Sequence, residues 1–235
     1  MTSRSILLGG AFGTALVLVL AGLPGSLRAD VPARIMPAPQ LDTPASGMQT
    51  AVFAGGCFWG VQAVFQHVNG VTETTSGYTG GTTANPSYEQ VSTGSTGHAE
   101  AVRVTFDPTR VSYATLLQIF FSVALDPTEV NRQGPDTGAQ YRSELFVTGP
   151  EQDRIAHAYV AQLGAAHLFD KPIATRIDPA PVFYPAEGYH QNYLIQHPHA
   201  PYIAMNDMPK VEALQHLFPQ MWRDIPVTVG ALAAR

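Results

Sequence analysis

Cys57 is the only cysteine in this chain of 235 residues, and its surroundings make it a candidate nucleophile. It stands in the stretch "AGGCFWG", where an apolar strand predicted over 50–56 and stopped by Gly55 and Gly56 meets a predicted helix. Unpaired backbone N–H groups and the positive end of a helix dipole stabilise a thiolate at such a position. We therefore expect a reactive thiol with a lowered pKa, and an inert, buried cysteine is the alternative.

Glu100 is the second residue whose position suggests chemistry. The stretch "HAEAVRVTF" (98–106) alternates strictly, which predicts a strand whose valines and phenylalanine share a face with Glu100. Desolvation raises the pKa of a carboxyl in apolar surroundings, so Glu100 can stay protonated near neutral pH and act as an acid. The alternative is a carboxylate at the strand end that reaches water.

Two polar loops and the residues after the thiol carry further candidates. Tyr88 lies in "NPSYEQV", and Asp136 and Tyr141 lie in "GPDTGAQYR". Loops often bring hydroxyl and carboxyl groups around a nucleophile, although each of these residues also fits a surface or packing role. Phe58 and Trp59 can be core residues or the wall of an apolar pocket, and we expect one of each kind.

The sequence gives little support for metal or phosphate binding. It contains no Cys-x-x-Cys and no His-x-x-x-His, and His197 and His199 in "HPHAPY" fit a polar loop better than a ligand pair. Gly55 and Gly56 alone are too short for a phosphate-binding loop. The net charge of −5, without a Lys/Arg cluster, argues against nucleic acid and anionic membrane surfaces as partners.

Alternating strand and helix patterns surround these residues. The patterns predict further helices over 58–68, 113–125 (with Ser112 as a cap), 150–169 and 210–218, and strands over 143–148 and 173–184. Segments 77–91 and 126–142 are predicted loops, and the chain after 184 is predicted to be mostly irregular. This order of elements predicts one α/β or α+β domain, about residues 50–225, with helices packed on a sheet.

The first 33 residues differ in kind from the rest. Arg4 precedes an apolar, uncharged run typical of a secretory signal peptide, and "VPA", ending at Ala33, fits a cleavage site. The run is near the lower length limit for spanning a bilayer, so an uncleaved anchor is the alternative. We predict an exported protein, periplasmic or otherwise extracytoplasmic, that contacts a membrane only if the leader is retained. Segment 34–49 is a predicted linker, and 226–235 is a C-terminal tail.

Six motifs, in this order, resemble the peptide methionine sulfoxide reductase A family. They are "GCFWG" (56–60), "GYTGG" (77–81), "NPSYEQV" (85–91), "TGHAEAVRV" (96–104), "RQGPDTGAQYRS" (132–143) and "FYPAEGYHQNY" (183–193). The resemblance covers about residues 50–222. It implies an α/β (α+β) two-layer sandwich with a mixed sheet, a ferredoxin-like core and a long irregular C-terminal tail. It also implies an enzyme that needs no metal or organic cofactor.

The activity that the family implies is reduction of the S epimer of methionine sulfoxide, free or in proteins, to methionine. Residue by residue, the resemblance makes Cys57 the nucleophile and Glu100 the acid that binds and protonates the sulfoxide oxygen. Tyr88 and Tyr141 match hydroxyls that assist this acid, and Asp136 matches a residue linked to the site through water.

The resemblance also implies a substrate pocket beside the thiol. Phe58 and Trp59 match the apolar pocket that holds the S-methyl group of the substrate. Gly56 and His190 are expected to bind substrate with them.

The sequence departs from many relatives after "YEQV", where some have a cysteine and this chain has Ser92. It therefore resembles the subgroup without a resolving cysteine. We expect the sulfenic acid left on Cys57 to be reduced by an external thiol, either a thioredoxin-like protein or a small thiol. We also expect a monomer.

Three other interpretations of the lone thiol stay open at this point. A thiol hydrolase or acyltransferase would pair Cys57 with His98 or His190 as a base. A thiol peroxidase or redox sensor would use the same cysteine against peroxide. A non-catalytic secreted binding module would hold a cysteine that resists alkylation in the native state.

Overall fold

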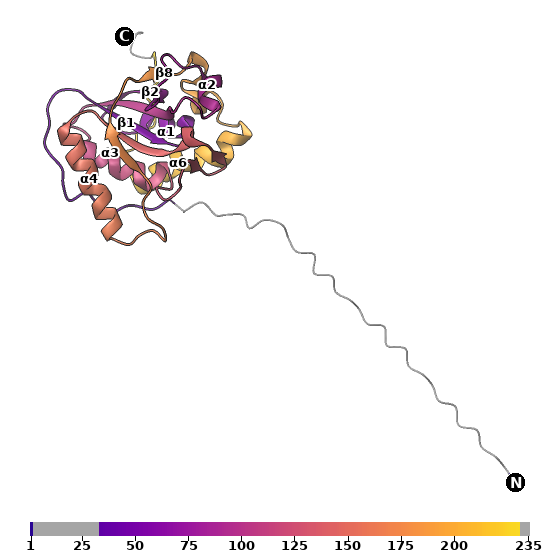
Figure 1. Ribbon diagram of the computed structural model, residues 1–235. Coiled ribbons are helices and arrows are strands. Elements are labelled where there is room, and N and C mark those ends of the chain that lie inside the picture. Colours follow the sequence, from indigo (N-terminus) through magenta and orange to yellow (C-terminus); the bar gives the residue numbers. More distant parts are fainter. Residues whose placement is uncertain (2–32, 231–235) are drawn as a thin grey trace.

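The structure, a computed structural model, describes Met1 and residues 33–230 (Figure 1). The predicted leader, apart from Met1 and Ala33, and the last five residues of the predicted 226–235 tail therefore lie outside the described residues. Within the described part, no helix is long and apolar enough to cross a membrane.

A six-stranded sheet forms the centre of the described chain, with the strand order β7-β6-β1-β3-β2-β8. Its strands are β1 (Gln49–Gly55), β2 (Val71–Thr79), β3 (Ala99–Phe106), β6 (Ser143–Val147), β7 (Arg176–Pro179) and β8 (Tyr184–Pro185). The β6–β7 pair is parallel and the other pairs are antiparallel, so the sheet is mixed. The order β6-β1-β3-β2, with helices after β1 and β3, confirms the predicted ferredoxin-like core.

The helices pack against the sheet to form the main hydrophobic core. They are α1 (Phe58–Gln66), α2 (Tyr88–Ser92), α3 (Tyr113–Ile119), α4 (Pro150–Ala165), α5 (Tyr193–Gln196) and α6 (Met208–Leu217). Helix α3 continues into a π-helical turn, η1 (Phe120–Ala124), and lies beside α4 (Figure 1). A smaller apolar cluster on the opposite sheet face is covered by Ala180 and Phe183.

Local sequence signals explain several of these elements. The alternation in β3 places Val102, Val104 and Phe106 in the main core and Ala99 and Ala101 in the opposite cluster, as predicted. Strand β3 therefore presents one continuous apolar face to the helices, and Glu100 belongs to that face by register.

Helix boundaries follow from caps. The Ser112 side chain accepts a hydrogen bond of 3.1 Å from the Thr115 N–H, which confirms it as the cap of α3. Pro150 opens α4 as expected. Helix α4 ends at Ala165 and not near 169 as predicted, since His167 takes a left-handed conformation with φ of +47°.

Several predicted loops contain regular structure. Residues 77–79 complete β2, and 88–92 form α2, which begins with a capping box between Ser87 and Gln90. The predicted loop 126–142 contains a short hairpin, β4 (Arg132–Gln133) with β5 (Asp136–Thr137), followed by a 3-10 turn, η2 (Ala139–Tyr141). Tyr88, Asp136 and Tyr141 therefore belong to regular elements, namely α2, β5 and η2.

Residues 34–48, here called the N-terminal strap, contain no helix or strand but are held along the body. The Arg34 and Met36 N–H groups donate to the Ser122 carbonyl and hydroxyl oxygens, at 3.2 Å and 2.9 Å. The Tyr159 hydroxyl donates to the Pro37 carbonyl at 2.9 Å, and Met36 is buried. The segment predicted as a linker is therefore fixed to η1 and α4.

Candidate active site

The thiol of Cys57 lies at the end of a sharp turn between β1 and α1. Gly56 has a φ of +86°, a left-handed conformation that favours glycine, and a Cβ there would collide with the Gln133 side chain. Cys57 is the N-cap residue of α1, and only 7% of it is exposed. The predicted place at the strand–helix junction is confirmed, and Gly56 acts by shaping the turn.

The predicted lowering of the Cys57 pKa is wrong for this state of the site. Burial raises the pKa of the thiol well above its usual range, and the charges of Glu100 and Asp207 raise it further. The N–H of Trp59 and the ammonium of Lys210 act in the opposite direction and are outweighed. The helix start is present, but desolvation decides the protonation state.

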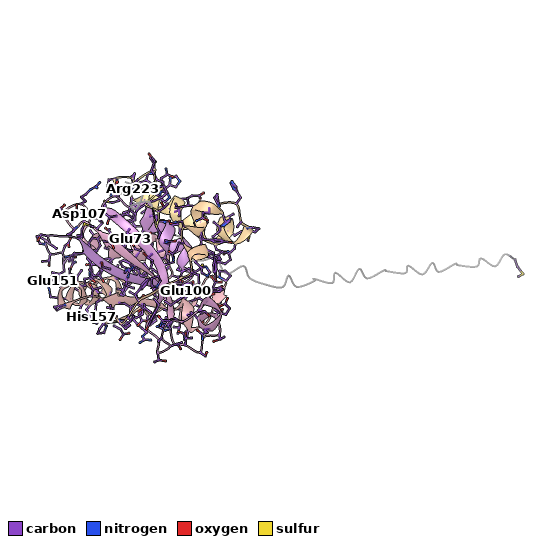
Figure 2. All side chains as sticks on the ribbon, turned by 90° about the horizontal axis from the view of Figure 1, so that it is seen from above. Glu73, Glu100, Asp107, Glu151, His157 and Arg223 are labelled. Carbon is purple, nitrogen blue, oxygen red and sulfur yellow. The ribbon has the colours of Figure 1, made fainter. Side chains whose placement is uncertain are left out.

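Glu100 lies beside the thiol because of the sheet register. Strands β1 and β3 are antiparallel with Phe53 opposite Val102, so the end of β1 that leads to Cys57 is level with the start of β3 that carries Glu100. Figure 2 labels Glu100 and Asp107, which mark opposite ends of β3.

The carboxyl of Glu100 is buried and protonated at neutral pH. Only 3% of the residue is exposed, and its Oε2 accepts a hydrogen bond of 3.0 Å from the Phe58 N–H. Burial raises the pKa of Glu100 to about 8, although the Phe58 N–H acts to lower it. The expectation of a neutral acid at this position agrees with the structure, and a strand-end carboxylate that reaches water is excluded.

Tyr88 and Tyr141 approach the same two groups, Cys57 and Glu100, from different elements, α2 and η2. Burial raises the pKa of both phenols, and the charges of Glu100, Cys57 and Asp136 raise it further, which places all five groups in one electrostatic neighbourhood. Both hydroxyls therefore remain protonated and can donate hydrogen bonds.

A residue that sequence reasoning missed holds Tyr88 in place. The Tyr88 N–H donates to Oε1 of Glu187 at 2.9 Å, and the buried Tyr78 hydroxyl donates to Oε2 at 2.8 Å. Glu187 stands in the predicted irregular tail, where a single acidic residue carries no pattern. Ser92, at the position where some relatives have a cysteine, donates to the Tyr88 carbonyl at 2.8 Å within α2.

Phe58, Trp59 and His190 form an aromatic group behind the thiol. Phe58 is 1% exposed, belongs to the core and lies 5.1 Å from the His190 ring, centroid to centroid. Trp59 is partly buried, stacks on Tyr193 at 3.9 Å and donates from Nε1 to Nδ1 of His190 at 3.2 Å. Phe58 is therefore a core residue, whereas Trp59 is only partly buried and packs against the core; its predicted role as a pocket wall stays a prediction.

The histidines do not support a thiol hydrolase. The two ring nitrogens of His98 bond to the Gly81 N–H at 3.1 Å and the Thr83 carbonyl at 2.7 Å, so this ring is committed to the loop after β2. Burial lowers the pKa of His190, and its Nδ1 is used by Trp59. Neither imidazole is hydrogen-bonded to Cys57.

A cavity of about 220 Å³ reaches Cys57 from the side of the C-terminal segment. Asp136 lines it, and its Oδ2 accepts a short hydrogen bond from the Tyr202 hydroxyl. Asp136 therefore faces the same cavity as Cys57 and is held by Tyr202, while its predicted catalytic role stays a prediction. Residues 33–230 contain no cluster of three or more His, Cys, Asp or Glu side chains that could hold a metal ion.

Comparison with known proteins agrees with this geometry. The family model described as "Peptide methionine sulfoxide reductase" matches residues 49–221, which is most of the chain and all the site residues above. The chain belongs to the peptide methionine sulfoxide reductase family.

Individual relatives cover the same region. Peptide methionine sulfoxide reductase MsrA 2 of Mesorhizobium japonicum is 54% identical over 185 residues, which is 79% of this chain and 95% of the relative. MsrA 2 of Synechocystis is 47% identical over 190 residues, 79% of this chain and 89% of the relative. The structure of methionine sulfoxide reductase A of Corynebacterium diphtheriae has a TM-score of 0.57 at 33% identity and covers 76% of this chain and 93% of that one.

In this family member, the C-terminal segment adds an ion pair that sequence reasoning also missed. Asp207 ends a π-helical turn, η4 (Ile203–Asp207), and Lys210 Nζ lies 3.1 Å from its Oδ1. Lys210 and Tyr202 line the cavity with Cys57. In the sequence, Asp207 precedes "MPK" at a position where an aspartate is commonly the N-cap of a helix. Its position therefore gave no separate indication of a functional site.

Proposed function

We propose that this chain reduces methionine-S-sulfoxide, free or in proteins, to methionine, with Cys57 as nucleophile and Glu100 as acid. Family membership supports the reaction class. The observation that carries the mechanism is the neutral, buried carboxyl of Glu100, attached to the N–H of the residue after the thiol.

The chemistry requires such an acid because a sulfoxide sulfur is electrophilic only when its oxygen is protonated or strongly hydrogen-bonded. Glu100 gives its proton to the sulfoxide oxygen, and the sulfur of Cys57 attacks the substrate sulfur. The S–O bond of the substrate breaks, and the oxygen leaves as water with the protons of Glu100 and of the thiol. Water then attacks the Cys57 sulfur and breaks the new S–S bond, so methionine leaves and a sulfenic acid remains on Cys57. The proton released in this step returns to the Glu100 carboxylate, and the site regains its acid.

The substrate binds between the aromatic group and the two phenols. Trp59 offers a partly buried aromatic face for the S-methyl group, backed by Phe58 and His190. Tyr88 and Tyr141 donate hydrogen bonds to the oxygen beside Glu100, since both stay protonated. Together these groups stabilise the charge that develops on oxygen.

An external thiol completes the cycle, because the chain has no second cysteine. The first donor sulfur displaces water from the sulfenic acid and forms a mixed disulfide with Cys57. A second donor thiol then attacks this disulfide and releases the Cys57 thiol, so two electrons pass from two thiols to one sulfenic acid. A thioredoxin-like protein or a small thiol has the required chemistry.

The deciding experiment measures reduction of each methionine sulfoxide epimer with and without a thioredoxin, using the native chain and Cys57→Ser. We expect turnover of the S epimer alone and no activity in the variant. Mass measurement after one turnover without reductant should show one added oxygen and no disulfide. Retained turnover in Cys57→Ser would contradict the mechanism.

A thiol peroxidase or redox sensor is disfavoured by the state of the thiol. Such cysteines are accessible and have a low pKa, whereas Cys57 is buried and burial raises its pKa. Slow alkylation of the native protein therefore fits an enzyme as well as an inert binding module, and only sulfoxide turnover separates the two.

We also propose export across the cytoplasmic membrane and a monomeric state. The charged start and apolar run of the first 33 residues support export. Cell fractionation with N-terminal sequencing tests the location and the cleavage site, and light scattering of the purified protein tests the mass. A full-length protein in the cytoplasm, or a stable dimer, would contradict these proposals.

A further inference from the structure

Asp207 is a fully buried carboxylate that the mechanism above does not use. None of the residue is exposed, and Oδ1 accepts a hydrogen bond of 3.1 Å from Lys210. Oδ2 is buried and has no hydrogen-bond partner among the described residues. Burial raises the pKa of Asp207, and the ion pair with Lys210 acts to lower it. Because a buried polar atom without a partner destabilises a fold, retaining Oδ2 in this state points to a role in the site.

The position of Asp207 brings its charge to the helix that carries the thiol. Its Oδ1 lies directly against Gly60, in the first turn of α1, and a Cβ at position 60 would overlap it. The π-helical turn η4 places it there, and such turns occur often at functional sites. Lys210 reaches from Asp207 into the cavity that contains Cys57.

Cys57 is therefore flanked by titratable groups from separate elements. Glu100 approaches from β3, and the Asp207–Lys210 pair approaches from the junction of η4 and α6. Asp136 from β5, bonded to Tyr202, faces the same cavity. The negative charge of Asp207 raises the pKa of both Cys57 and Glu100, and the charge of Lys210 lowers that of Cys57.

We propose that Asp207, held by Lys210, is a specificity-determining residue that keeps Cys57 a protonated thiol until sulfoxide binds, and so protects this lone cysteine from peroxide. Peroxide reacts with the thiolate: sulfur attacks one oxygen, the O–O bond breaks, and sulfenic acid and hydroxide form as sulfur loses two electrons. Sulfoxide still reacts with the protonated thiol, because Glu100 donates a proton to the sulfoxide oxygen and so makes the sulfoxide sulfur electrophilic. The proposal rests on the proposed function only in naming sulfoxide as the favoured substrate.

The test compares Asp207→Asn with the native protein in the absence of sulfoxide. Because Cys57 is the only cysteine, the pH dependence of thiolate absorbance and of alkylation reports on this residue alone. We expect the variant to titrate at least about one pH unit lower, which raises the thiolate fraction and the rate of peroxide oxidation at neutral pH about tenfold. Single-turnover reduction of sulfoxide should not rise in the same proportion.

Two further variants separate charge from packing. Glu212→Gln removes an exposed carboxylate from the same helix α6 and should change neither titration nor peroxide rate. Lys210→Met leaves Asp207 ionised at the high pH where the thiol titrates, so its thiol should titrate higher than native. A downward shift in Lys210→Met, or an Asp207→Asn variant that matches Glu212→Gln, would overturn the proposal. The titration, alkylation and peroxide measurements use no sulfoxide, so they decide whether Asp207 keeps the thiol protonated even if sulfoxide turnover is absent.

Discussion

The N–H of Phe58 donates a hydrogen bond of 3.0 Å to Oε2 of Glu100, which attaches the buried acid to the helix turn that begins at the thiol. The two residues are 42 positions apart and belong to α1 and β3. Helix α1 packs on the central sheet that contains β3. The acid and the nucleophile are therefore positioned by the packing of helix on sheet and not by loops. Figure 2 shows Glu100 within the body, while Glu151 and His157 lie on α4 at its edge.

Replacing Glu100 by glutamine should remove most sulfoxide reduction without unfolding the protein. Glutamine keeps the size and can still accept the Phe58 N–H, but it has no acidic proton to give. General acids contribute about 10²–10⁴ in rate, so we expect a single-turnover rate at least about a hundredfold lower. Rapid-quench measurement of methionine release tests this, and a native-like rate would show that the proton comes from another group.

The sulfoxide reductase step should fall as pH rises through about 8. Glu100 is active in its protonated form, and burial raises its pKa to about 8, so the acid is present below that pH and lost above it. The single-turnover rate of the native protein, measured against pH, should show this decrease near pH 8. The decrease should be absent in Glu100→Gln, and a decrease that persists in the variant would mean that another group titrates there.

The same carboxyl should make folding stability depend on pH. Its pKa is 4.5 when unfolded and about 8 when folded, so between these values the folded state holds a proton that the unfolded state has lost. Stability from this group is complete below pH 4.5 and decreases as pH rises to about 8, by on the order of a few kcal/mol. Urea unfolding across this range should show a smaller decrease for Glu100→Gln than for the native chain, and equal slopes would contradict the assignment.

Removing Glu187 should lower both stability and activity. Glu187→Ala leaves the Tyr88 N–H and the buried Tyr78 hydroxyl without their acceptor, which destabilises the fold by about 1–3 kcal/mol. We also expect slower sulfoxide reduction because Tyr88 loses its anchor. The matched control in urea unfolding and rate measurements is Glu89→Ala, which removes an exposed acid from α2, the helix that carries Tyr88. Equal stability and equal rates for the two variants would show that the hydrogen bonds of Glu187 to the two tyrosines are not needed.

Local patterns were enough to predict the parts of this molecule that depend on neighbours in sequence. The strand–glycine–helix junction correctly predicted Cys57 at the start of a helix, and the alternation of β3 correctly predicted Glu100 on the face of the strand that points to the core. The six motifs resembled one family, and the family match confirms it.

The missed features depend on contacts between distant segments. The direction of the Cys57 pKa was wrong because a helix start is visible in sequence, whereas burial and the approach of Asp207 are not. Asp207 lies about 150 residues after the thiol, and its contact with Gly60 arises only when η4 packs on α1. Glu187 is likewise defined by its two tyrosine partners, which come from β2 and α2.

The two ends of the described body are unequal places for attaching a tag or a fused domain. Ala33, the residue before the N-terminal strap, lines the cavity together with Cys57. At the other end, the Val227 N–H bonds to the Gln66 carbonyl at 3.0 Å, at the end of α1 opposite the thiol. An affinity handle or surface linkage beyond residue 230 therefore leaves the cavity open, whereas one placed just before Ala33 stands beside the thiol.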